Sequence, residues 1–341
     1  MAARSRPARS PRRRPAPRRR VARTSAPVVE QLRAIERGGG DGELRLGGGK
    51  RLHVSSLDKS YFEHVGVTKG GLMRYYATIA GVLLPIIKDR PLILKRYPEG
   101  VPGPSFFQQN AGAHVPPGVR TAIVATEDGT AERFIGGDLI TLLYTVQLGA
   151  IAVHTWQARI RTPSAADTAT IDLDPGDDVP FREVVRVAKV IGTELDRLRL
   201  RAAIKTSGSS GLHIALPLPA NTPFELSAEL ASRVAARVVA AIPDLATTER
   251  SVRARPTGTV YVDAQQNAQG KSVVAAYSVR ERPEATVSAP IEWRELTLSL
   301  RLESFTIATV TKRVRTKGDP WTAALKRRNT RQALDRALRD A

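Results

Sequence analysis

The 341-residue sequence contains no cysteine, no long apolar run and comparatively few acidic residues. Without cysteine, the protein can form neither a disulfide framework nor a cysteine-ligated zinc or iron–sulfur site. No apolar run approaches the roughly 20 residues of a membrane-spanning helix, and the longest, residues 79–87, is too short. The N-terminal segment lacks the apolar stretch of a secretory signal, and its proline density argues against an amphipathic transit peptide. We therefore expect a cytoplasmic protein with no membrane partner.

The shortage of acidic residues leaves the protein strongly basic. Its 53 lysine and arginine residues outnumber 33 aspartate and glutamate residues, which gives a formal net charge of +20 at pH 7. Residues 1–27 contain ten arginines and no acidic residue, so residues 28–341 still carry a charge of +10. A globular part this basic indicates a polyanionic partner, most simply nucleic acid. An incidental positive charge explains an excess of this size less well.

Composition divides the chain into three segments. Residues 1–27 are rich in arginine and proline and have almost nothing to bury, which predicts disorder. Two glycine triplets within residues 37–49 predict a flexible connector over residues 28–49. Residues 50–341 have a mixed globular pattern, and we expect them to form a single catalytic domain with a basic amphipathic helix from residue 321 onward.

Hydrophobic periodicity predicts helices and strands that interleave without strict βαβ alternation. The expected strands span residues 92–95, 121–126, 150–154, 202–206, 212–216, 259–263 and 272–278. The expected helices span residues 68–84, 139–148, 181–199 and 222–242. Thr68 is the predicted N-cap of the first helix, and Thr222 opens a predicted capping box before the last. This order predicts an α+β fold, or an α/β fold with mixed sheets.

Two aspartates, Asp172 and Asp174, lie at the end of an apolar run that stops at a Pro-Gly turn. Side chains alternate between the faces of a strand, so these two carboxylates are expected on one face. Adjacent carboxylates repel each other unless a cation lies between them, and Mg²⁺ and Mn²⁺ prefer oxygen ligands of this kind. By itself the pair is weak evidence, because polar residues at a strand end are often simply solvated. A third carboxylate, Asp263, ends another apolar run, so a metal site built from two strand ends is the leading hypothesis.

A loop of small residues, residues 205–213, lies between these acidic strand ends in the sequence. Its backbone N–H groups and serine hydroxyls have the chemistry that holds phosphate oxygens, although a plain hairpin would explain the loop equally well. It is not a Walker A motif, because no Gly-Lys-Ser/Thr sequence ends it. His213, Arg280 and Lys95 are ordinary basic residues when each is taken alone. Together with the carboxylates and the loop they predict metal-assisted nucleotidyl transfer.

A series of short motifs extends from residue 52 to residue 334. They are Leu57-Asp58-Lys59, Val67-Thr68-Lys69-Gly70, Arg90-Pro91-Leu92, Leu94-Lys95-Arg96-Tyr97-Pro98, Pro104-Ser105-Phe106-Phe107-Gln108, His154-Thr155-Trp156, Asp172-Leu173-Asp174-Pro175, Thr206-Ser207-Gly208, Val262-Asp263, Asn267, Tyr277-Ser278-Val279-Arg280 and Gly318-Asp319-Pro320-Trp321. In order and spacing this series resembles the polymerase domain of bacterial ligase D, a branch of the archaeo-eukaryotic primase superfamily. A resemblance that covers nearly the whole globular part is not expected by chance.

The resemblance implies a primase-polymerase fold, in which a cracked, RRM-like catalytic sheet packs against a second α/β module. Asp172, Asp174 and Asp263 would be the catalytic residues and would hold two Mn²⁺ or Mg²⁺ ions. The implied nucleotide-binding residues are Lys95, His154, Ser207, His213, Gln266 and Arg280. The implied DNA-binding residues are Lys59 and Lys69, which would bind a 5′-phosphate, and Phe106 and Phe107, which would stack on template bases. Core packing is the alternative for the two phenylalanines.

The implied activity is template-dependent nucleotidyl transfer with NTPs and dNTPs, which fills short gaps or extends ends of 5′-phosphorylated DNA during repair. No Lys-x-Asp-Gly ligase motif occurs, so we expect a stand-alone polymerase that depends on a separate DNA ligase. The end-binding protein Ku is a further candidate partner, and the expected location is the cytoplasm, in association with the nucleoid. The sequence leaves both break joining and excision repair open as the pathway.

Two positions depart from the family pattern. The Ser-Gly loop has Ser210 where the family usually carries Lys or Arg, so one cation for the triphosphate is missing unless another replaces it. Lys205, Arg253 and Arg255 are the candidates for that replacement, although residues 253–258 themselves differ from the family's more basic approach to the third aspartate. Weaker nucleotide binding would follow, which keeps open a catalytically weak or inactive DNA-end or gap-binding protein on the same scaffold. A nuclease with the same metal ligands is a third hypothesis, without the family match.

The arginine-rich segment 1–27 should add affinity for DNA without adding selectivity. Deleting it should flatten the dependence of log affinity on log salt, because each neutralised phosphate contributes about −0.9 to that slope on duplex DNA. The preference for a 5′-phosphate should be unchanged. Titrations of the full-length and truncated proteins at several salt concentrations measure both quantities. Superimposable slopes would contradict the polycation role and favour a protein-docking or targeting segment.

Overall fold

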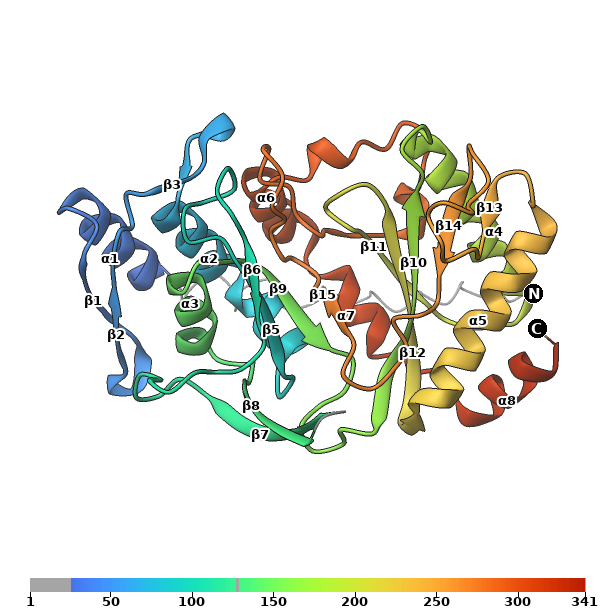
Figure 1. The fold of residues 1–341 in the computed structure, drawn as a ribbon, viewed down its shortest axis with the longest axis horizontal. Coiled ribbons are helices and arrows are strands. Elements are labelled where there is room, and N and C mark those ends of the chain that lie inside the picture. The colour runs from blue at the N-terminus through green and yellow to red at the C-terminus, as the bar shows by residue number, and fades with distance from the viewer. Residues whose placement is uncertain (1–25, 127–128, 341) are drawn as a thin grey trace, which may run out of the picture.

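The computed structural model describes residues 26–126 and 129–340, which form two α/β modules side by side (Figure 1). The first module is built on a four-stranded sheet with the strand order β15-β9-β5-β6, and the second on a six-stranded sheet with the order β13-β14-β10-β12-β11-β16. One continuous set of buried apolar side chains extends through both modules. The predicted mixture of α and β structure, with two sheet modules, is confirmed.

The four-stranded sheet of the first module is antiparallel throughout. Its strands are β5 (Leu92–Arg96), β6 (Phe106–Gln108), β9 (Ala150–Trp156) and β15 (Ser272–Val274). Helices α1 (Ala26–Arg37), α2 (Lys69–Ile87) and α3 (Leu139–Gln147) belong to the same module. It also contains the strand pairs β1 (Gly42–Arg45) with β2 (Arg51–Val54), β3 (Ser60–Phe62) with β4 (Val67–Thr68), and β7 (Thr121–Thr126) with β8 (Gly129–Phe134). Because β15 comes late in the sequence, the chain passes through the second module before it completes the first sheet.

The six-stranded sheet of the second module is antiparallel except for the short parallel pair β13–β14. Its strands are β10 (Ala165–Pro175), β11 (Ala203–Thr206), β12 (Leu212–Pro223), β13 (Ala246–Thr247), β14 (Val260–Asp263) and β16 (Pro290–Ile291). Helices α4 (Phe181–Arg197), α5 (Phe224–Ala241) and α8 (Arg331–Asp340) lie at this end of the molecule. Helices α6 (Ile307–Lys317) and α7 (Pro320–Leu325) lie in the middle, α6 against α2 and α7 against β11 and β12 (Figure 1). Short 3₁₀ turns occur at Gly47–Gly49, Glu63–Val65, Trp293–Glu295 and Leu302–Ser304.

Local sequence explains where several helices begin and which face they bury. The Thr68 side chain accepts the backbone N–H of Gly71 at 2.9 Å, so the predicted N-cap of α2 is confirmed. Apolar residues three and four apart along α4 are buried, among them Val184, Ile191 and Leu195, which is the predicted amphipathic pattern. By length and composition alone α2 could cross a membrane, so the expectation that no segment could do so is wrong by that measure. However, 61% of its apolar window is buried inside the protein, as in a core helix.

The predicted flexible connector over residues 28–49 is wrong. Most of this segment is folded as α1 and β1, and the side chains of Leu32 and Leu44 are fully buried. Glu36 of α1 also forms an ion pair with Arg74 of α2. The glycine triplets only form the turns at either end of β1, and the apolar residues outside them are spaced to pack on the module. Residues 1–25, which include nearly all of the predicted disordered tail, lie outside the described residues.

Three boundary predictions are also wrong. Thr222 is the penultimate residue of β12 and donates its hydroxyl to Pro219 O at 2.9 Å, so it does not cap α5. The single basic helix predicted from residue 321 is divided into α7 and α8, and Asp319 caps α7 by accepting the backbone N–H of Trp321 at 3.0 Å. The strand predicted over residues 272–278 ends at Val274, because the following residues turn and Tyr277 adopts a φ of 70°. The first and third errors lie at the end of an element, where backbone partners rather than side-chain pattern decide the boundary, whereas the second is a break inside the predicted helix.

Replacing Leu32 with alanine should lower the free energy of unfolding by about 2–5 kcal/mol, because the removed side chain leaves a cavity between α1 and the rest of the module. Urea denaturation followed by circular dichroism measures the change. Arg33→Ala is the matched control, since this half-exposed side chain only pairs with Glu30 on the surface. Equal stability of the two variants would mean that α1 does not pack as described.

Candidate active site

One row of side chains runs across four neighbouring strands of the second sheet. Asp263 of β14 is paired with Asp172 of β10, and Asp172 is also paired with His213 of β12. His213 is in turn paired with Lys205 of β11. Directly paired residues project from the same face of a sheet, so the register places all four side chains on one face. Asp174, two residues beyond Asp172 in β10, shares that face because strand side chains alternate. The structure therefore brings together the three aspartates that the sequence singled out.

Repulsion among these carboxylates is substantial. Burial, followed by the charge of Asp174, raises the pKa of Asp172 well above its ordinary value, while Lys205 acts in the opposite direction. Burial and the charge of Asp263 likewise raise the pKa of Asp174. Like charges opposite each other in a sheet destabilise it, so this arrangement is not explained by stability. Strongly perturbed carboxylates that line a cavity are typical of functional sites.

The chemistry of this site fits a hard divalent cation. The Oδ1 atom of Asp172 is buried and accepts no hydrogen bond from any described residue; His213 Nε2 lies 3.2 Å away, but without hydrogen-bond geometry. Asp263 is held differently, since its Oδ1 accepts the backbone N–H of Gln265 at 2.6 Å and its Oδ2 accepts Gln266 Nε2 at 3.3 Å. In residues 26–126 and 129–340 no three acidic or histidine side chains already converge on one point. The oxygen donors are therefore of the right kind and on the right face, but the three carboxylates must move closer together to share an ion.

A cavity of about 220 Å³ lies beside the carboxylates and is lined by residues of both sheets. His154 of β9 and Val274 of β15 come from the first sheet, whereas Asp172 and His213 come from the second. Burial, reinforced by the charge of Arg280, lowers the pKa of His154 to about 4, so its ring is neutral at neutral pH. Its Nε2 atom is buried without a partner among the described residues and is free to bond a ligand. Burial and the nearby Lys205 lower the pKa of His213 well below its ordinary value as well.

The Ser-Gly loop closes one side of this cavity through Ser207, Ser209 and Ser210. The hydroxyl of Ser207 accepts the backbone N–H of Ser209 at 3.0 Å and of Gly211 at 2.9 Å. These two N–H groups already donate within the loop. Fewer backbone N–H groups are therefore available to bind phosphate oxygens than the sequence predicted. A Cβ atom on Gly211 would lie 1.7 Å from the carbonyl oxygen of Leu173, so only glycine allows the loop to lie this close to β10.

Arg280 and Lys95 are joined by an acidic residue that sequence reasoning missed. Arg280 donates to Ser207 O at 3.0 Å and lies 3.3 Å from Glu281, and Lys95 lies 3.3 Å from the same carboxylate. Burial acts to raise the pKa of Glu281, but the charge of Arg280, the hydrogen bonds to the carboxylate and the charge of Lys95 together outweigh burial and lower the pKa to about 2. Arg280 and Gln266 line the cavity, whereas Lys95 reaches it only through Glu281. The position of Glu281 directly after Arg280 was the only sequence signal for this bridge.

Besides Arg280, a second cation contacts the Ser-Gly loop: Arg282, which is not among the replacement candidates named from the sequence. Its Nε atom donates to Ser209 Oγ at 3.0 Å. Lys205 is instead buried behind His213, and Arg255 lies over the ring of Tyr261, 3.9 Å from its centroid. An Arg-x-Arg spacing, with Arg282 two residues after Arg280, was the signal available in the sequence.

Phe106 and Phe107 are exposed, at 49% and 62%, so the alternative of core packing is wrong. Both lie on β6, which is an edge strand of the first sheet. The guanidinium of Arg96 lies 5.1 Å from the centre of the Phe106 ring, and Lys95 Nζ lies 5.9 Å from that of Phe107. Exposed rings beside cations have the chemistry of a surface that stacks bases and attracts phosphates.

Lys59 and Lys69 are brought together at the start of α2. The backbone N–H of Lys69 donates to Lys59 O at 2.8 Å, and the Lys69 side chain, 6% exposed, donates to Ser55 O at 2.9 Å. Burial, reinforced by the charge of Lys59, lowers the pKa of Lys69 to about 8. Lys59 is more exposed and is paired with Glu99 at 2.5 Å. Two cations held close together at a helix N-terminus would be stabilised by an anion.

Comparisons with known proteins identify sequences and a structure that are similar to this chain. A family model described as "LigD, primase-polymerase domain" matches residues 68–321. The chain is 35% identical over 257 residues to the multifunctional non-homologous end joining DNA repair protein LigD of Mycobacterium tuberculosis, covering 72% of this chain and 34% of that protein. It is 33% identical over 272 residues to the bifunctional non-homologous end joining protein LigD of Bacillus subtilis, covering 80% of this chain and 44% of that protein. The chain thus spans about a third to less than half of the length of these relatives.

A solved structure is similar over most of the chain. The polymerase domain from Mycobacterium tuberculosis Ligase D in complex with DNA superimposes with a TM-score of 0.76 at 33% sequence identity, covering 82% of this chain and 99% of that one. The fold, the family model and the relatives point to one conclusion. This chain belongs to the LigD primase-polymerase domain family, nucleotidyltransferases of the primase-polymerase type.

Proposed function

We propose that this protein is a template-dependent nucleotidyltransferase that fills short gaps or extends ends of 5′-phosphorylated DNA during repair, with either NTPs or dNTPs. The observation that carries the proposal is the row of Asp263, Asp172 and His213 beside a cavity lined by both sheets. Support for a role in non-homologous end joining comes from the names of the relatives and from the DNA in the similar structure. DNA ligase activity and the end-binding protein Ku are the partners we propose for such a role, and the nucleoid is the expected location.

Asp172, Asp174 and Asp263 would hold two Mn²⁺ or Mg²⁺ ions, which would supply charge neutralisation at the triphosphate and activation of the primer 3′-hydroxyl. The unpartnered Oδ1 of Asp172 supports this assignment. Turning Asp263 toward the ions would release Gln266, which lines the cavity and could then contact the nucleotide. Burying three negative charges without a cation is costly. This cost supports a site in which the carboxylates converge only when the metal ions bind.

The residues around the cavity can bind and orient the nucleotide. Arg280 and Arg282 supply positive charge to the Ser-Gly loop at Ser207 and Ser209, and Arg282 would compensate for the missing basic residue at Ser210. His154, with its free Nε2, and His213 and Ser207 would contact the nucleotide directly. Lys95 would not contact the nucleotide directly. It would neutralise the charge of Glu281 and hold the Phe107 ring through a cation–π contact.

The surface of the first module would hold the DNA. Phe106 and Phe107 would stack on template bases, which any base can satisfy. Lys59 and Lys69 would bind the 5′-phosphate on the downstream side of a gap. Base stacking and 5′-phosphate binding would both be carried out by the first module. The distance between the two phenylalanines and the two lysines would then set which gap lengths are filled.

A catalytically weak DNA-end or gap-binding protein is the second candidate function. It is favoured by Ser210 in the loop and by the carboxylates that do not yet converge. Incorporation on a one-nucleotide gap, with NTPs and dNTPs in Mg²⁺ and in Mn²⁺, separates the two functions. Incorporation supports the polymerase, whereas tight binding to the same gap without incorporation supports the binding protein.

Replacing Asp172 or Asp174 with alanine should reduce incorporation at least about 100-fold, because each change removes charge stabilisation at the reacting phosphate. Binding to gapped DNA should stay equal or become slightly tighter, since a negative charge near phosphate is lost. Primer-extension gels and fluorescence anisotropy measure the two effects. Asp178→Ala is the matched control, an exposed aspartate beyond the same strand. Gap filling at the wild-type rate in Asp172→Ala would exclude the metal assignment.

Replacing Lys69 with methionine should remove most of the preference for a 5′-phosphate over a 5′-hydroxyl. A buried charge-assisted contact is worth about 1.5–3 kcal/mol, which corresponds to a loss of about tenfold or more. Lys59→Met should have a smaller effect, because Lys59 is more exposed and already paired with Glu99. Anisotropy with the two DNA ends measures the preference, and Lys88→Met, an exposed lysine at the other end of α2, is the control for lost charge. Equal affinity of the wild type for both ends would contradict the phosphate site.

A further inference from the structure

Lys205 is a buried cation that the assignments above leave without a role. Its side chain is 2% exposed on β11, and its position opposite His213 places it on the face that carries the catalytic aspartates. Burying an ammonium group is costly unless it is hydrogen bonded and near opposite charge. Burial lowers the pKa of Lys205 to about 7, although the charge of Asp172 acts to raise it. An apolar residue would satisfy a purely structural position on this strand at lower cost.

The hydrogen bonds of Lys205 have a defined direction. Its Nζ atom lies 2.6 Å from Ser288 Oγ and 3.1 Å from His213 Nδ1. Ser288 donates its only hydroxyl hydrogen to Thr206 O at 2.8 Å, so it can only accept from Lys205. An ammonium group has three N–H donors and no acceptor, so in its charged form, which the nearby Asp172 carboxylate favours, Lys205 also donates to the histidine ring. His213 Nδ1 is therefore the acceptor, and the neutral ring carries its hydrogen on Nε2.

The opposite edge of the ring lies at the catalytic site. His213 Nε2 is 3.2 Å from Asp172 Oδ1 without hydrogen-bond geometry, and the residue lines the catalytic cavity. A hydrogen on Nε2 is thus available to an oxygen atom that enters the cavity. With the hydrogen on Nδ1, the ring would instead direct a lone pair toward the carboxylate and toward any phosphate oxygen, which would repel both.

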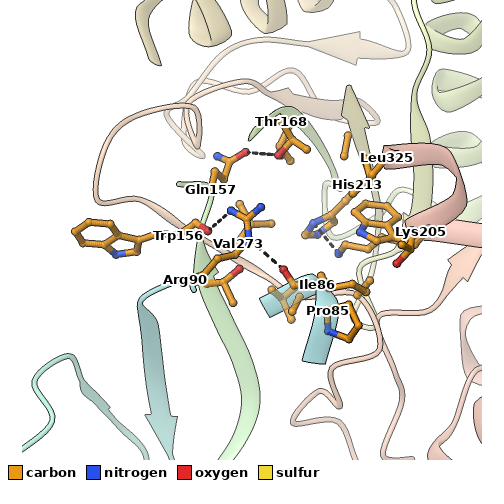
Figure 2. A pocket seen from close by; sticks show the side chains of 18 of the residues that line it. Pro85, Ile86, Arg90, Trp156, Gln157, Thr168, Lys205, His213, Val273 and Leu325 are labelled. Carbon is orange, nitrogen blue, oxygen red and sulfur yellow. Dashed lines mark hydrogen bonds between the residues drawn. The ribbon is translucent and has the colours of Figure 1, made fainter. Parts of the chain in front are cut away.

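A second cavity, of about 410 Å³, shows how Lys205 is separated from the nucleotide. It shares His213, Val273 and Val274 with the catalytic cavity, and Lys205 lines this second cavity only. Figure 2 shows Lys205 joined to His213 across one side of it, with Arg90 and Gln157 on the other. Lys205 thus contacts the ring from behind rather than the reacting groups.

From this geometry we propose that Lys205 is a positioning residue that holds His213 in the form with hydrogen on Nε2, as a donor to the triphosphate of the incoming nucleotide. The direction of the hydrogen bond from Lys205 to His213 does not depend on the reaction. The role of His213 toward the triphosphate, in contrast, rests on the proposed function. The competing explanation is that Lys205 only connects β11 to the segment that contains Ser288. The two explanations differ in what they predict for the ring of His213.

The ring form is measured directly by ¹⁵N NMR, because the two neutral forms of histidine differ in their nitrogen shifts. The protein has only five histidines, and His213→Gln identifies the signal. We expect hydrogen on Nε2 in the wild type, and a shift toward the Nδ1 form in Lys205→Met. Ser288→Ala is the matched control, since it removes the connection to Ser288 and leaves the bond to His213, so its ring form should match the wild type. Hydrogen on Nδ1 in the wild type, or an unchanged ring in Lys205→Met, would overturn the proposal.

Kinetics then test the role in binding the nucleotide. Partners that orient a functional histidine are typically worth about 10–100-fold, so we expect the KM for the nucleotide to rise by that factor in Lys205→Met, with a smaller change in kcat. Ser288→Ala should keep a KM near that of the wild type. An unchanged KM in a Lys205→Met protein whose ring form has shifted would overturn the link to the nucleotide. If the wild type itself incorporates nothing, the proposed function fails while the NMR result on Lys205 still stands. If Lys205→Met does not fold, the wild-type NMR spectrum still tests the proposal, because hydrogen on Nδ1 of His213 would overturn it.

Discussion

The register of β14, β10, β12 and β11 is the constraint on which the candidate site depends. Antiparallel pairing aligns Asp263, Asp172, His213 and Lys205 in one row, and a slip of one residue in β10 would turn both of its aspartates to the opposite, core-packed face. The register is held from the other face, where Ile171, Leu173 and Ile214 are fully buried. The same strands thus supply a hydrophobic core on one side and a cluster of like charges on the other.

In this arrangement the three aspartates repel one another, and nearby basic residues offset only part of that repulsion. Lys205 and Arg280 oppose the repulsion at Asp172, and Arg255 and Arg280 do so at Asp174. The basic groups are themselves balanced, as Glu281 is between Arg280 and Lys95. Carboxylates beside basic groups can bind a cation and a polyanion together. A metal-bound triphosphate has this combination of charges. The overall positive charge of the chain acts over longer distances and would attract a polyanion such as DNA.

The two modules contribute different parts of the site, so their packing decides its completeness. The second module supplies the carboxylates and the Ser-Gly loop, while the first supplies His154, the exposed phenylalanines and the paired lysines. The return of the chain through β15 connects the modules, because this strand pairs with β9 beside His154. Arg282, which contacts the loop at Ser209, brings a cation from another segment to a loop in which the sequence analysis expected a basic residue at the position of Ser210.

The sequence by itself located helices α2 to α5 and most of the strands that carry the candidate site, because their apolar spacing matches the period of each element. It also identified the three aspartates from their position at strand ends. It could not show that residues 28–49 are folded, because glycine triplets suggest flexibility whether or not the apolar residues beside them find a partner. It could not find Glu281, Arg282 or the role of Lys205 either. Charged residues of this kind occur throughout a basic sequence, and only tertiary structure decides which of them are buried and which atoms they contact. Pairing between β10 and β14, 91 residues apart at Asp172 and Asp263, likewise becomes visible only in the folded sheet, because local sequence pattern carries no information about which distant strand is the neighbour.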